Sequence, residues 1–156
     1  MSIIEEALGV LKAREFIAVA TADKRGKPHS APKLLLKIVG GIVYFIDYSI
    51  SRTAENLKAN PVVSLSFIDI DSLFGYVLNG TVEIIEKGKI YNECLKDFRE
   101  KKIGLSVERV IKGIHEGKTH KEFELEIPES FLVYKVNIEE GAEISPRGEI
   151  KREDSQ

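Results

Sequence analysis

The residues best suited to chemistry lie in the segment Ser51-Arg52-Thr53, which opens a predicted short helix near residues 52–59. Ser51 is a good N-cap residue, so Arg52 and Thr53 fall in the first helical turn, where the helix dipole disfavours a cation. A bound phosphate would neutralise Arg52 and accept hydrogen bonds from backbone N–H groups and from the two hydroxyls. The segment therefore indicates either an anion site or a solvated arginine beside an ordinary helix cap.

Two further cations, Lys33 and Lys37, lie in a strand predicted over residues 30–39. Because alternate side chains of a strand face opposite sides, Lys33, Leu35 and Lys37 are predicted to share one surface. The two lysine Cα atoms should lie about 13 Å apart at the usual strand rise, so one lysine can reach a given phosphate. The alternative is a pair of solvated lysines on a half-exposed strand.

The other reactive side chains give weaker indications. His115 and His120 lie in a polar segment, 115–121, that is predicted to be a loop and lacks the acidic partners of a metal site. His29 could touch a ligand at the start of its strand, but a structural role is preferred. Cys94, the single cysteine, has a core spacing on its helix and excludes an intrachain disulfide. The chain also has no P-loop, nucleophile elbow or Rossmann glycine motif.

The elements that position these residues follow from apolar periodicity and turn signals. Strands are predicted at 15–21, 30–39, 42–47, 62–70, 76–85, 123–127 and 131–138, and helices at 3–14, 52–59, 89–101 and 106–114. A Gly40-Gly41 hairpin joins the lysine strand to the strand that leads into the Ser51 helix. Six or so strands with short turns predict one mainly β domain, 1–138, with peripheral helices. Residues 139–156 are expected to form a charged tail, mobile at its end.

The ordered segments HSAPKLLLK, VYFIDYSISRTAENLKANPVVSLSF and YVLNGTVEII resemble the pyridoxamine 5′-phosphate oxidase-like family of FMN-binding split barrels. In that family a basic residue ends the strand that carries the Leu-Leu-Lys sequence. A Ser-Arg step then opens a short helix that closes in Asn-Pro, and a later strand carries Gly-x-x-Glu, here Gly80 to Glu83. The resemblance covers about residues 12–86. It implies an antiparallel six-stranded Greek-key split β-barrel.

The resemblance also implies a cofactor and its contacts. The FMN phosphate would meet Arg52, its neighbours and one of Lys33 or Lys37, and the ring would lie along residues 32–36 and 45–48, touched by a second subunit of a homodimer. The implied cofactor contacts are Lys33, Leu34, Leu35, Lys37, Phe45, Ile46, Asp47, Ser51, Arg52 and Thr53. Thr53 stands where the vitamin B6 oxidases usually have lysine, and their tryptophan-containing substrate motif is absent. The resemblance therefore implies the flavin site and not B6 oxidation.

Composition narrows the function classes. At 156 residues and a net charge of −2, the chain has no basic field that would favour nucleic acid. The sequence shows no leader peptide or membrane-length apolar run, so a soluble cytoplasmic protein without a membrane partner is expected. We predict an FMN-dependent oxidoreductase with a small-molecule substrate. The alternatives are a non-enzymatic flavin protein that stores, senses or relays electrons, and a split barrel that binds deazaflavin F420 or haem.

Overall fold

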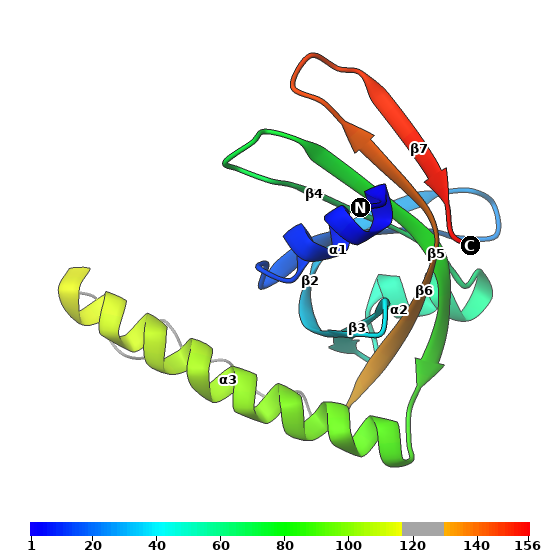
Figure 1. The fold of residues 1–156 in the computed structure, drawn as a ribbon. Coiled ribbons are helices and arrows are strands. Elements are labelled where there is room, and N and C mark those ends of the chain that lie inside the picture. The colour runs from blue at the N-terminus through cyan, green and yellow to red at the C-terminus, as the bar shows by residue number, and fades with distance from the viewer. Residues whose placement is uncertain (117–129) are drawn as a thin grey trace.

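Six antiparallel strands close into a barrel in the computed structural model, which describes residues 1–116 and 130–156 (Figure 1). The strands are β1 (Phe16–Ala22), β2 (Pro28–Val39), β3 (Ile42–Tyr48), β4 (Val62–Ile68), β5 (Gly75–Ile85) and β6 (Phe131–Ile144). They follow the order β3-β2-β1-β4-β5-β6, and pairing of β3 with β6 closes the ring. The chain leaves β3 through a helix and returns beside β1 as β4, which is a Greek-key connection. The predicted fold class is confirmed.

A seventh strand corrects the expectation that residues 139–156 form a charged tail outside the domain. Strand β6 continues to Ile144, and β7 (Ile150–Asp154) pairs with its second half. The turn between them is closed by Ser145, whose hydroxyl accepts from the N–H of Arg147 and of Glu149. The many charged residues of this segment favoured a tail over a hairpin in the sequence. Two of them, Arg152 and Glu140, form an ion pair across the two strands at 3.1 Å.

The described residues form three helices: α1 (Ile3–Leu11), α2 (Arg52–Ala59) and α3 (Lys89–Glu116). The expectation of two separate helices over 89–114 is wrong, because α3 runs unbroken for 28 residues and includes His115, which was expected in a loop. Gly104 falls at an exposed point of α3, where glycine weakens a helix without ending it. The rest of the predicted loop and the strand predicted at 123–127 lie outside the described residues. No described helix is long and apolar enough to cross a membrane.

Apolar side chains form two clusters, one on each side of the sheet. The interior cluster fills the barrel with residues such as Phe45, Leu65 and Leu78, and α1 and α2 contribute to it. The outer cluster lies between the barrel and the first half of α3, where Cys94 and Phe98 pack near residues of β2, β3 and β6. Cys94 is fully buried there, which confirms its predicted packing position. Beyond this contact α3 projects away from the barrel (Figure 1).

Gly80 lies at a close approach of β5 to β6. The pairing slips between Asn79 and Gly80, so that Glu139 is an extra residue in β6. A Cβ atom at Gly80 would lie 2.1 Å from the backbone oxygen of Asn137. Only glycine therefore fits this position without moving one strand from the other.

We expect Gly80→Ala to lower the free energy of unfolding by about 1–3 kcal/mol, because the methyl group meets backbone rather than a movable side chain. Gly104→Ala is the control: a Cβ there meets nothing within 4 Å, and alanine should strengthen α3 by up to about 1 kcal/mol. Denaturant unfolding followed by circular dichroism measures both. A Gly80→Ala protein as stable as wild type would contradict the close approach.

Candidate functional site

The Asp47 carboxylate is the centre of a buried polar network that joins β2, β3, β6 and the start of α2. Its Oδ1 accepts hydrogen bonds from Lys33 Nζ and from the Tyr48 backbone N–H, both at 2.8 Å. Its Oδ2 accepts from the Ser51 hydroxyl and, at 2.8 Å, from the Tyr134 hydroxyl. The Asp47 side chain is only 2% exposed. Four hydrogen-bond donors thus take the place of the water molecules that the Asp47 carboxylate loses when it is buried.

Tyr134 enters this network from β6 as a neutral donor. Burial raises the pKa of the Tyr134 hydroxyl well above its usual value, and the adjacent Asp47 charge raises that pKa further. The phenol therefore keeps its proton and donates a hydrogen bond to the carboxylate.

The N-terminus of α2 stands on the same carboxylate. Ser51 caps the helix as the sequence predicts: its Oγ accepts from the Ala54 N–H at 2.9 Å while donating to Asp47. A negative charge next to the positive end of the helix dipole is favourable. The Ser51 hydroxyl, which was expected to contact a phosphate, is therefore already committed to Asp47 and Ala54.

The prediction that Lys33 and Lys37 share one surface is wrong, because a β-bulge separates them. Leu35 pairs with Phe45 but Lys37 pairs with Tyr44, so Leu36 is an extra residue and the alternation shifts. Lys33 turns toward Asp47. Lys37 turns to the opposite side of the sheet.

On that side, Lys37 Nζ lies 2.6 Å from an Asp97 carboxylate oxygen of α3 and 5.6 Å from the centre of the Tyr44 ring. The hydrogen bond to Asp97 raises the pKa of Lys37. Each lysine thus has a carboxylate partner of its own.

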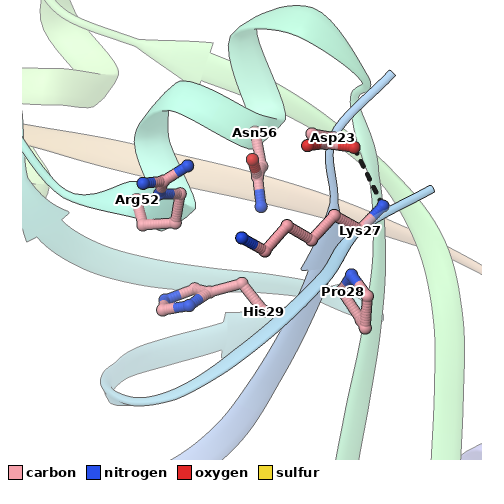
Figure 2. A pocket seen from close by; sticks show the side chains of 6 residues that line it. All are labelled: Asp23, Lys27, Pro28, His29, Arg52 and Asn56. Carbon is pink, nitrogen blue, oxygen red and sulfur yellow. Dashed lines mark hydrogen bonds between the residues drawn. The ribbon is translucent and has the colours of Figure 1, made fainter. Parts of the chain in front are cut away.

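Arg52 is the expected phosphate ligand that remains available. Its side chain is 58% exposed, and its one ion pair among the described residues is with Glu55, at 3.5 Å. An ion pair this exposed is weak. Figure 2 shows Arg52 at the wall of a pocket, beside Asn56 of the same helix and opposite Lys27 and His29 of the β1–β2 hairpin. Asp23 and Pro28 complete the lining, and the pocket has a volume of about 180 Å³.

The other expected cofactor contacts are buried. Thr53 is fully buried, and its hydroxyl oxygen has no hydrogen-bond partner among the described residues. The apolar residues expected along the ring also lie inside the two clusters: Leu34 and Ile46 under α3, Leu35 and Phe45 in the barrel. None of these residues is more than 9% exposed.

A shallow groove of about 400 Å³ lies on β1, β4 and β5. The pairing of Ala18 with Ser66 and of Ala20 with Ser64 places small side chains on the outer face of β1 and β4. The residues that line the groove are Ala20, Thr21, Ala22, Val62, Val63, Ser64, Asn79, Gly80 and Glu139. Such a floor admits a flat ring or another protein surface.

Lys27 and Asn56, which line the pocket with Arg52, were not among the predicted site residues, and His29 was assigned a structural role in preference to a ligand contact. The residues Asp23 to Lys27, with Gly26 among them, are typical of a turn, but whether Lys27 faces α2 depends on where that helix lies in space. For Asp47 a signal was available: it is the one charged residue in the otherwise apolar strand β3. A charge in such a strand needs an internal partner.

Comparisons with known proteins agree with this architecture. A family model described as pyridoxamine 5′-phosphate oxidase matches residues 3–144. A haem-binding protein from Mycobacterium smegmatis superposes with a TM-score of 0.66 at 14% identity; the alignment covers 99% of this chain but 58% of that one. No curated protein sequence matches.

Two further solved structures share the fold. A pyridoxamine 5′-phosphate oxidase-related, FMN-binding protein from Nostoc punctiforme has a TM-score of 0.58 at 14% identity, with 97% and 95% of the two chains covered. A protein described as an F420 reductase has a TM-score of 0.57 at 18% identity, with 85% and 93% covered. At these identities the likeness shows the fold alone.

We expect Asp47→Asn to lower the free energy of unfolding by about 3–5 kcal/mol, because it leaves the Lys33 ammonium buried without a counter-charge. Asp97→Asn is the matched control, since it breaks the half-exposed pair with Lys37 and should cost at most about 1 kcal/mol. Lys33→Met should fall between them, because Asp47 keeps three donors. Chemical denaturation measures all three, and equal losses for the two asparagine variants would contradict the central role of Asp47.

Proposed function

This chain belongs to the pyridoxamine 5′-phosphate oxidase family, and we propose that it is a flavin-binding member that holds FMN with its phosphate against Arg52. One observation carries the proposal: Arg52 stands at the positive end of α2 with its guanidinium exposed and only weakly paired. A cation at this end of a helix is unfavourable by itself. A phosphate beside Arg52 would be attracted both by its guanidinium and by the positive end of the helix dipole.

The donor set fits a phosphate in part. Arg52 and the first backbone N–H groups of α2 suit the group, whereas Ser51, Lys33 and Lys37 are engaged by carboxylates. The solved FMN-binding structure of the same fold supports a flavin in this family. The proposed site therefore depends on fewer protein cations than the sequence suggested.

We also propose a homodimer in which a second copy covers the outer groove on β1, β4 and β5. The groove is open and floored by small residues. A flavin ring laid there would be exposed on one face unless a protein surface covered it, and firmly held ligands are largely enclosed. A twofold dimer would build two equivalent sites.

When bound, FMN supplies hydride or electron transfer, and the residues of the chain bind and orient it. We therefore propose an oxidoreductase with a small-molecule substrate. A flavin protein without a substrate is the alternative, and turnover with NAD(P)H and a panel of acceptors separates the two. Solved structures of this fold also include a haem-binding protein and an F420 reductase, so haem and deazaflavin are alternative cofactors.

The purified protein should show the two-band flavin spectrum and release FMN on denaturation. Native mass spectrometry should give twice the chain mass of 17.5 kDa plus two cofactors. A haem or deazaflavin spectrum would show that the cofactor is one of these and not FMN. A colourless protein that gains no thermal stability from added FMN would refute flavin binding. A monomer with FMN bound would refute the dimer alone.

Arg52→Ala should weaken FMN binding by about tenfold to a hundredfold, because it removes a charge-assisted contact worth roughly 1.5–3 kcal/mol. Riboflavin lacks the phosphate, so its affinity should barely change. Lys58→Ala, in the last turn of the same helix, is the matched control and should alter neither affinity. Fluorescence titrations with both ligands measure this. Equal losses for FMN and riboflavin would place Arg52 at the ring or in the fold instead.

A further inference from the structure

We propose that Lys27 and His29 of the β1–β2 hairpin form, with Arg52, a pocket for a phosphate monoester. Under the proposed function, on which this assignment rests, the ligand is the phosphate of FMN. The positive charge around that phosphate then comes from the hairpin, and not from the β2 lysines that the family resemblance suggests. Figure 2 shows the Lys27 amino group, the His29 ring and the Arg52 guanidinium around one pocket.

The hairpin holds Lys27 in a defined place. Asp23 Oδ1 accepts from the backbone N–H of Arg25 and of Lys27, both at 2.9 Å. Two backbone bonds, from Asp23 N–H to the Lys27 carbonyl and from Gly26 N–H to the Asp23 carbonyl, close the turn, and Gly26 has φ +82°. The Lys27 side chain therefore starts from a fixed backbone rather than from a loose loop.

The opposite wall is tied to the same hairpin. Asn56 is 4% exposed, and its Nδ2 donates to Thr21 Oγ1 at 3.0 Å. Thr21 is the cross-strand partner of His29. Arg52 lies one turn before Asn56 on the same face of α2. The hairpin and the helix thus hold the three basic side chains around a pocket that already exists.

The charges in the pocket favour an anion. Lys27 makes no ion pair within residues 1–116 and 130–156, and Arg52 has only its exposed contact with Glu55. Asp23 is the one acidic residue in the lining, and one of its oxygens already accepts two backbone N–H groups. Two cations that face one pocket repel each other unless an anion lies between them. A phosphate monoester carries between one and two negative charges near neutral pH and accepts several charge-assisted hydrogen bonds.

The volume suits a terminal group rather than a whole cofactor. Pockets that enclose complete small molecules usually measure about 300–1,000 Å³, whereas this one measures about 180 Å³. Its lining includes Pro28 and His29 of β2, which pair with Ala22 and Thr21 of the groove lining. A phosphate in the pocket therefore leaves the ring system to bind elsewhere.

The test compares FMN with riboflavin on matched variants. Lys27→Gln and His29→Gln should each weaken FMN binding by about tenfold and leave riboflavin unchanged. Lys24→Gln removes the same charge from the same turn outside the pocket, and it should change neither affinity. Thermal unfolding shows that each variant is folded. A loss of FMN affinity confined to Lys37→Gln, or equal effects of Lys24→Gln and Lys27→Gln, would overturn the assignment.

A second measurement separates this inference from the proposed function. The ring resonances of His29, identified by their absence in His29→Gln, should shift when inorganic phosphate is added and should not shift in Lys27→Gln with Arg52→Ala. If wild type binds neither flavin but His29 responds in this way, the flavin proposal fails and the phosphate pocket stands. If His29 responds neither to FMN nor to inorganic phosphate, the pocket assignment fails even where flavin binds.

Discussion

The arrangement of the site depends on one buried carboxylate. Asp47 receives hydrogen bonds from β2 through Lys33, from β6 through Tyr134, and from the cap of α2 through Ser51. A charge that is 2% exposed is costly to bury unless donors such as these replace its water. The same network therefore fixes the start of α2 against the barrel. Because Arg52 follows Ser51 directly, the network also fixes where that cation emerges.

This carboxylate changes what the site can offer a cofactor. A phosphate at the start of α2 would compete with Asp47 for the Ser51 hydroxyl and for Lys33. The internal anion holds both donors without any loss of translational freedom, which a ligand must give up on binding. Among the described residues of this region, Arg52 and Lys27 line one pocket and are not engaged by a buried carboxylate. Because Asp47 engages Lys33 inside the protein, the positive charge open to a ligand lies at Arg52 and Lys27 instead of on β2.

Two irregularities in the strands determine which side chains face where. The bulge at Leu36 sends Lys33 into the network and Lys37 to α3, and the nearby Leu35 carbonyl accepts from Lys101 of that helix. Burial lowers the pKa of Lys101, so this ammonium depends on its carbonyl partner. At the other bulge, Gly80 admits the Asn137 carbonyl. Each bulge costs ladder hydrogen bonds and redirects the residues beyond it.

The sequence by itself determined the class of fold, the helix cap at Ser51, the core role of Cys94 and the exposed cation at Arg52. These features are local: alternation, turn residues and capping follow from neighbours in the chain. It also suggested two wrong elements, a charged tail over 139–156 and two separate helices over 89–114. The β6–β7 pairing that orders the tail is visible only in space.

Only the tertiary structure decided the partners of the charges. One extra residue, Leu36, reverses the side to which Lys37 points, and periodicity carries no sign of it. Arg52 follows Lys27 by 25 positions and His29 by 23, so nothing in the spacing predicts that the three line one pocket. The folded barrel brings them together because Asn56 bonds to Thr21 and Asp47 holds the start of the helix. The local sequence determines where helices and strands form, whereas the hydrogen bonds of buried polar groups determine which side chains of those elements meet.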